Sequence, residues 1–164
     1  MKNNTYSLVL MALLTALLFI GQVIMGVLPN IEIVSLLVIL YTVFFGRKVF
    51  LIIYTFVFLE GFFYGFGIWW FNYIYIWSIL AIIVLAFRKN TSVMTWSIIS
   101  GFFGLFFGTL CSLPYFITGG FAAGISYITA GLMFDITHCI GNFFVCLILF
   151  KPLYRLLDMA VNKS

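Results

Sequence analysis

Residues 49–87 read VFLIIYTFVFLEGFFYGFGIWWFNYIYIWSILAIIVLAF, and this stretch decides the fold. It lies between Lys48 and Arg88 and contains one charged residue, Glu60. A helix needs about 20 apolar residues to cross the hydrocarbon core of a bilayer. The stretch is too long for one crossing and suits two, so it predicts a pair of membrane-spanning helices.

The basic residues divide the rest of the chain in the same way. The pairs Arg47–Lys48 and Arg88–Lys89 separate three blocks without Lys or Arg, and the other basic residues lie near the two ends, at Lys2, Lys151, Arg155 and Lys163. Basic loops face the cytoplasm, so each block should hold an even number of crossings. We therefore expect an all-α integral membrane protein, a single domain over residues 1–164, with six transmembrane helices and both termini cytoplasmic.

The composition excludes the soluble alternative. Hydrophobic residues make up 65% of the chain and charged residues 7%, whereas a soluble domain carries about 25% charged residues. A soluble fold of this composition would expose large apolar patches. The topology accounts for all eight basic residues, so the net charge of +4 gives no reason to expect a nucleic-acid partner.

The helices should alternate with short outer turns that carry no positive charge. Turn-forming Pro, Asn and Gly mark these outer turns at 28–31, 67–72 and 116–124. An aromatic belt at the membrane surface is indicated at the second turn by Trp69, Trp70, Tyr73 and Tyr75. The expected helices span residues 6–27, 32–46, 49–66, 73–87, 92–115 and 125–150.

Ionisable side chains inside the membrane are costly and therefore point to function. Asp135, His138 and Asn142 follow a spacing of i, i+3 and i+7 in the last helix, which places them on one face. Ser126 and Thr129 lie broadly on the same side. The stripe either contacts a ligand or forms a hydrogen-bond network between helices. No second His exists to complete a metal site, so no metal is expected.

Other polar residues lie toward the outer ends of the helices. Glu60 either binds a polar ligand group or accepts a hydrogen bond from a neighbouring helix, for example from His138. Asn30 is suited to cap the second helix and Glu32 to complement its dipole, while the turn that contains them covers an outward-facing site. The candidate substrate-binding residues are Gln22, Asn30, Glu32, Glu60, Trp70, Asn72, Asp135, His138 and Asn142.

The first helix contains the pattern Ala12-Leu-Leu-Thr-Ala16, in which two small residues lie one helical turn apart. Together with the small size and the six-helix topology, this pattern resembles the substrate-binding S components of energy-coupling factor (ECF) transporters. The resemblance implies a multi-pass protein of the bacterial cytoplasmic membrane that captures a vitamin or related micronutrient. It also implies that Ala12 and Ala16 dock on a transmembrane coupling protein, which works with two ATPase subunits.

The chain itself carries no nucleotide-binding motif, so we expect neither an enzyme nor a cofactor-binding protein. The acids and His138 favour a ligand with several hydrogen-bond donors and a cationic or aromatic part. Thiamine-, pyridoxine-, queuine-, pantothenate- and cobalamin-like ligands all stay open. An anionic ligand fits least well, because no Lys or Arg lies near the expected pocket.

A second interpretation is an intramembrane enzyme. The segment from His138 to Asn142 matches the His-xxx-Asn element of CAAX-type membrane proteases. Those proteases also carry two adjacent acids followed by an Arg, and this sequence has no adjacent acids. His138 would act as a base without the partner acids of these proteases, so the enzyme is the weaker of the two interpretations.

Overall fold

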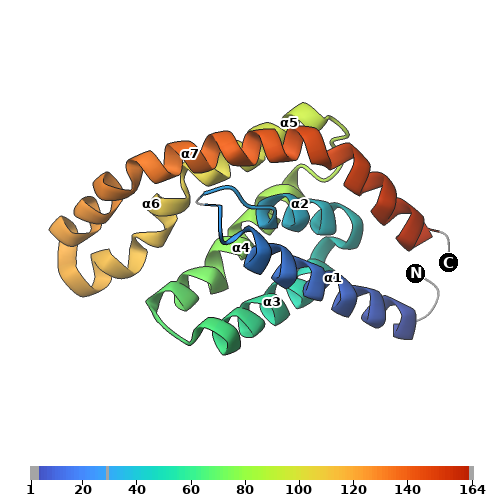
Figure 1. The fold of residues 1–164 in the computed structure, drawn as a ribbon, viewed down its shortest axis with the longest axis horizontal. Helices are drawn as coiled ribbons and strands as arrows, with labels where there is room; N and C mark the ends of the chain where they lie inside the picture. The colour runs from blue at the N-terminus through green and yellow to red at the C-terminus, as the bar shows by residue number, and fades with distance from the viewer. Residues whose placement is uncertain (1–3, 29, 163–164) are drawn as a thin grey trace.

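The structure is a computed structural model that describes residues 4–28 and 30–162, and these residues form helices without a strand (Figure 1). The helix α7 is interrupted at Gly120, whose φ of 73° and ψ of −172° are not helical. The elements in chain order are α1 (Asn4–Met25), α2 (Val34–Phe45), the 3-10 turn η1 (Gly46–Lys48), α3 (Val49–Tyr64), α4 (Ile68–Ala86), α5 (Val93–Leu105), α6 (Phe107–Cys111) and α7 (Leu113–Asn162).

Several helices are long and apolar enough to cross a membrane. Four segments of the described residues meet this criterion, at Thr5–Met25, Val34–Tyr64, Ile68–Ala86 and Leu113–Val161, and the apolar helix α5 is shorter. The segment Val34–Tyr64 is two helices rather than one, because the chain turns at Gly46, where φ is 58° and ψ is −134°. The expected all-helical chain with several apolar helices is confirmed.

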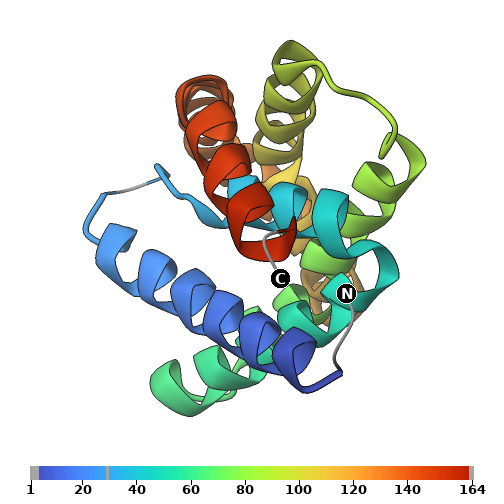
Figure 2. The same cartoon turned by 90° about the vertical axis from the view of Figure 1, so that its right-hand side faces the viewer.

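Both ends of the described chain lie at the same end of the molecule (Figures 1 and 2). The hydroxyl of Tyr6, in the first turns of α1, donates to the carbonyl oxygen of Ala160 near the end of α7 at 2.7 Å. The ring of Tyr154 packs on Phe44 at the end of α2, with centroids 4.8 Å apart. The guanidinium of Arg88, after α4, donates to the carbonyl of Phe44 at 3.3 Å. We call this end, where the basic residues of the described chain gather, the basic end.

The helix α2 lies inside the bundle rather than at its surface. Most of its residues are buried, and Val34, Val38, Ile39, Leu40 and Thr42 have no exposed surface. A helix that is apolar on all sides is stable only when it is surrounded, here by α1, α4 and α7. With 12 residues it is about 18 Å long, which is shorter than a membrane core of about 30 Å.

A stripe of glycines allows α5 and α6 to pack closely against α7. Gly101, Gly104 and Gly108 recur at spacings of four and three residues and face α7. A Cβ on Gly104 would lie 2.8 Å from the backbone oxygen of His138, and one on Gly108 would lie 2.5 Å from the carboxylate of Asp135. Small residues at these positions therefore bring the backbones close together.

The helix boundaries differ clearly from the expected ones in four places. The helix expected at 73–87 begins at Ile68, because Gly65, with φ 86°, and Gly67 complete the turn and the aromatic residues after them join the helix. The helix expected at 92–115 breaks after Leu105. Residues 116–124 are helical except at Gly120, and the last helix continues to Asn162 instead of ending at 150.

Candidate functional site

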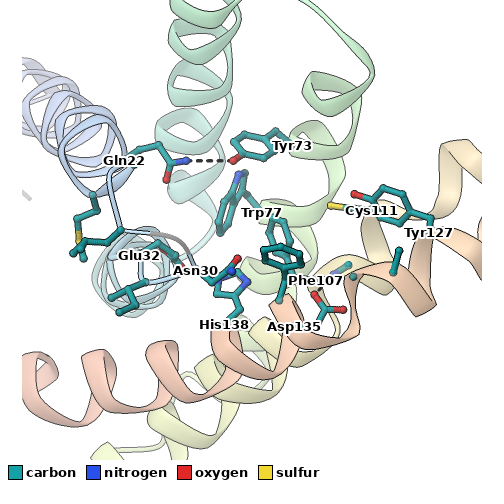
Figure 3. A pocket seen from close by; sticks show the side chains of 18 residues that line it. Gln22, Asn30, Glu32, Tyr73, Trp77, Phe107, Cys111, Tyr127, Asp135 and His138 are labelled. Carbon is teal, nitrogen blue, oxygen red and sulfur yellow. Dashed lines mark hydrogen bonds and ion pairs between the residues drawn. The ribbon is translucent and has the colours of Figure 1, made fainter.

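A cavity of about 550 Å³ lies between the end of α1, the loop before α2, the first half of α4, and α6 and α7 (Figure 3). No Lys or Arg occurs among the described residues that line it. The polar and aromatic side chains of this wall are those of Gln22, Asn30, Glu32, Tyr73, Trp77, Phe107, Cys111, Tyr127, Phe134, Asp135 and His138. We call this space the outer cavity, because it lies away from the basic end.

The loop before α2 forms one wall of the outer cavity. Asn30 adopts a left-handed conformation, with φ 60°, which Asn tolerates better than most residues. A Cβ on Gly141 would lie 3.0 Å from the backbone oxygen of Asn30, so the glycine lets the loop lie directly on α7. This close approach places Ile31 and Glu32 at the cavity.

Glu32 joins this loop to α7 and to the start of α2. Its Oε1 lies 3.4 Å from Nε2 of His138, and its Oε2 accepts a 2.8 Å hydrogen bond from the backbone N–H of Ser35. Burial opposes ionisation of the carboxyl, but the hydrogen bond and charge of His138, together with Ser35, outweigh it and lower the pKa of Glu32. The side chain of Glu32, and not that of Asn30 as expected, therefore accepts the hydrogen bond from the first turn of α2, whose N-cap residue is Ile33.

Asp135 lies beside the break between α5 and α6. Its Oδ1 accepts a 2.9 Å hydrogen bond from the backbone N–H of Gly108, in the first turn of α6. This bond satisfies a donor that has no partner within the helix. Asp135 is buried but still lines the outer cavity, so it combines a structural contact with access to a bound molecule.

Aromatic side chains form the opposite wall. The amide of Gln22 donates to the hydroxyl of Tyr73 at 3.3 Å and so connects α1 with α4 across the cavity (Figure 3). The ring of Phe107 packs edge-on against His138, with centroids 5.1 Å apart, and lies 5.8 Å from the ring of Trp77. Nε1 of Trp77 is buried without a hydrogen-bond partner among the described residues.

The structure brings five of the nine candidate residues together. Gln22, Asn30, Glu32, Asp135 and His138 all line the outer cavity. They come from α1, the loop before α2, and α7, so the fold unites positions that lie far apart in the sequence.

The other four candidates lie outside the lining. The ring nitrogen of Trp70 donates to the carbonyl of Val57 at 2.9 Å, and the amide of Asn72 donates weakly to the carbonyl of Cys111 at 3.4 Å. The side chain of Asn142 donates to the hydroxyl of Ser35 at 3.2 Å and holds α7 against α2.

Glu60 is the fourth of these candidates. It is buried in α3, and its Oε1 has no hydrogen-bond partner in the described chain. The expected possibility of a bond between Glu60 and His138 is not realised, because His138 pairs with Glu32 instead.

Sequence reasoning missed the aromatic lining. Tyr73 was assigned to an interfacial belt, but it faces the outer cavity together with Trp77, one turn later in α4. Ser126 and Thr129 were expected on the polar stripe, whereas Tyr127 and Gly131 occupy the cavity side. Extending the helical period back from His138 in steps of four and three residues reaches Phe134, Gly131 and Tyr127, and this pattern could have identified them.

The two alanines of α1 lie away from the outer cavity. Ala12 is exposed and Ala16 is half-buried, and Val9, Leu13 and Leu17 are exposed around them. The exposed face of α1 is thus apolar and carries a small residue at its centre.

Comparison of the chain with protein-family models, with curated proteins and with solved structures gives no match.

Proposed function

We propose that this chain is a membrane protein with six crossings that binds a small molecule in the outer cavity and delivers it to partner proteins. The cavity itself carries the proposal, because its wall combines Glu32, Asp135 and His138 with aromatic rings in a volume of about 550 Å³. Pockets of roughly 300–1,000 Å³ with a few polar groups on an apolar wall are typical of small-molecule sites.

The topology supports binding from outside the cell. The turns that contain Arg47, Lys48, Arg88 and Lys89 lie at the basic end, which the positive-inside rule assigns to the cytoplasm. We count six passes between the two ends, taking α5, α6 and the first segment of α7 together as the fifth. The outer cavity, reached at Gln22 near the end of α1, then opens toward the external side.

The chemistry of the wall favours a ligand with hydrogen-bond donors and a flat or cationic part. Two carboxylates, without a Lys or Arg among the described lining residues, disfavour an anion. Tyr73, Trp77, Phe107 and Tyr127 offer ring faces and edges, which attract cations and aromatic groups. Vitamin-like heterocycles have this combination of groups.

The energy for uptake would come from other subunits. We assign the chain the role of an S component in an ECF-type importer, with the exposed face of α1 around Ala12 docking on a transmembrane coupling protein. Two ATPase subunits would drive release on the cytoplasmic side. The small side chain of Ala12 permits close approach of a partner helix.

Mass spectrometry of small molecules retained by the detergent-purified chain tests the proposal directly. We expect one compound to be enriched over a mock purification and to rebind after removal with micromolar affinity or better. Co-purification of ATPase subunits from native membranes supports the transport role. Cleavage of a peptide by the isolated chain, abolished by His138→Ala, would support the protease alternative and overturn our assignment.

A further inference from the structure

A second cavity lies at the basic end of the molecule, far from the outer cavity. It has a volume of about 390 Å³ and lies between the end of α2, the turn from α4 to α5, and the last part of α7. Arg88, Lys151 and Arg155 line it, and no carboxylate is among the described lining residues. Asp158, one turn beyond Arg155 on α7, lies outside the lining. We call this space the basic cavity.

The side chain of Arg88 is held in place by the end of α2. Its Nε donates to the carbonyl of Val43 at 2.9 Å, and its Nη2 donates to the carbonyl of Phe44 at 3.3 Å. A Cβ on Gly46 would lie 2.8 Å from Nη1, so glycine at this position leaves room for the guanidinium. A cation that is already positioned loses less freedom when it binds an anion.

The start of α5 adds a second attraction for negative charge. Asn90, Thr91 and Val93 line the basic cavity, and α5 begins at Val93 after its N-cap, Ser92. The N-terminus of a helix carries a partial positive charge and exposes backbone N–H groups. The helix terminus and the three cations therefore both favour a negatively charged ligand.

The deeper part of the basic cavity is apolar and aromatic. Trp96 and Phe150 are buried and stack with centroids 6.3 Å apart at an interplanar angle of 15°. Phe150 also stacks on Tyr154 at 5.9 Å. The cavity thus presents cations at its rim and an apolar wall behind them, an arrangement that fits a molecule with a charged head and hydrocarbon chains.

We propose that the basic cavity binds the phosphate group of an anionic membrane lipid. Arg88, Lys151 and Arg155 contact the phosphate oxygens, and the acyl chains lie along the apolar helix surfaces below the rim. Basic pockets between helices on the cytoplasmic side suit such head groups. This inference needs only a membrane-embedded chain and does not depend on the transport role.

Thermal unfolding and native mass spectrometry of the full chain in nonionic detergent test the proposal. The probes are phosphatidylglycerol, phosphatidylcholine, inorganic phosphate and a short acidic peptide. We expect phosphatidylglycerol to remain bound and to raise the unfolding temperature, with an effect that weakens as NaCl is added. Phosphatidylcholine, which has no net charge, should have little effect.

Two double variants with the same change in charge locate the site. The variant Lys151→Gln/Arg155→Gln should bind phosphatidylglycerol about thirtyfold more weakly, from roughly fivefold per lost cation. The control Arg47→Gln/Lys89→Gln removes two exposed cations outside the basic cavity and should bind as the wild type does. If the first variant does not fold, Lys151→Gln alone should show about fivefold weaker binding and Lys151→Arg none of this loss.

Equal losses of affinity for phosphatidylglycerol in the two double variants would overturn the proposal. They would show that the lipid is attracted to the general positive charge of the surface. An equal stabilisation by phosphatidylcholine would overturn it as well. Stabilisation by inorganic phosphate that matches the effect of phosphatidylglycerol would overturn the lipid as the source of the phosphate. Stabilisation only by an acidic peptide would assign the basic cavity to a protein partner instead.

Discussion

Nε2 of His138 lies 3.4 Å from Oε1 of Glu32, and this contact connects the middle of α7 with the loop before α2. The two side chains are 9% and 14% exposed, so the pair is largely shielded from solvent. Asn142 adds a bond to Ser35 one turn further along α7. His138 therefore holds the loop, and Asn142 holds α2, against α7, while Asp135 and His138 of the same stripe also line the outer cavity.

The pH dependence of unfolding should reveal the contribution of Glu32. Its pKa is lower in the folded protein than the ordinary value of 4.5, so the stabilisation is complete above about pH 4.5 and is lost as the pH falls through the folded pKa. Glu32→Gln should lower the free energy of unfolding by about 1.5–3 kcal/mol at pH 7. Thermal unfolding in detergent between pH 3 and pH 7 measures the difference.

The informative quantity is the difference in free energy of unfolding between the wild type and Glu32→Gln. This difference cancels the contributions that the other ionisable groups make to both proteins. The two proteins should converge in stability at the lowest pH. A constant difference from pH 7 to pH 3 would show that the charge of Glu32 contributes nothing.

Asp135→Asn should weaken ligand binding more than it weakens folding. The amide oxygen of Asn can still accept the hydrogen bond from the N–H of Gly108, but the negative charge facing the outer cavity is lost. A lost charge-assisted bond corresponds to about 1.5–3 kcal/mol, or roughly tenfold to a hundredfold in affinity. Calorimetric titration with the retained compound measures this, and Asp158→Asn is the control outside the cavity. Unchanged affinity with a lower unfolding temperature would mean that Asp135 is only structural.

Gly104→Ala should destabilise the packing of α5 on α7. The new Cβ would lie 2.8 Å from the backbone oxygen of His138, and neither backbone can move aside without disturbing its helix. We expect a loss of about 1–3 kcal/mol in the free energy of unfolding, measured by denaturant titration in detergent. Gly131→Ala is the matched control, because nothing lies within 4 Å of its Cβ position, and it should not lower stability. Equal stabilities of the two variants would refute the close contact.

Replacement of Ala12 by Trp should block assembly without affecting the fold. Ala12 is exposed on α1 and far from the lining of the outer cavity, so the bulky ring meets no neighbour in the isolated chain. Ligand affinity should stay unchanged, while ATPase subunits no longer co-purify and uptake stops. Ile82→Trp, at an exposed position of α4 outside the docking face of α1, should assemble normally. Normal uptake by Ala12→Trp, or an equal defect in both variants, would show that Ala12 faces lipid only.

Cysteine labelling should place the two ends of the molecule on opposite sides of the membrane. In a background without Cys111, Cys139 and Cys146, single cysteines at the exposed positions Val27, Phe66 and Phe121 should react with a membrane-impermeant maleimide added to intact cells. Cysteines at Arg47 and Lys89 should react only after permeabilisation. Labelling of position 47 in intact cells would overturn the six-crossing topology.

The membrane character and the helix pairs were predictable because each depends on local sequence. A basic pair such as Arg88–Lys89 and the run of apolar residues before it define the end of a crossing without any knowledge of contacts. The end of α4 at Ala86 lies one residue from the predicted boundary. Its start was misplaced at 73, because Trp69 and Trp70 suit both a membrane surface and a helix, and only packing against α3 decides between them.

The candidate site was only partly predictable for a related reason. Polarity in a membrane helix identified Asp135 and His138, and the helical period placed them on one face. The pairing of His138 with Glu32 instead of Glu60 depends on the path of the loop before α2, where Asn30 has a positive φ. No local pattern specifies that path. The aromatic lining was missed because aromatic residues are common throughout this chain, at 21%.

The helix α7 reaches both cavities of the molecule. Its break at Gly120 lies outside the stretch from His138 to Lys151, and Pro152 follows directly after this stretch, so one helix carries residues of both the outer cavity and the basic cavity. These two positions are roughly 20 Å apart at about 1.5 Å per residue, so a tilt of about 5° around His138 displaces Lys151 by about 2 Å. A displacement of that size exceeds the tolerance of a hydrogen bond. We therefore expect a tilt of α7 at the outer cavity to change the geometry of the basic cavity.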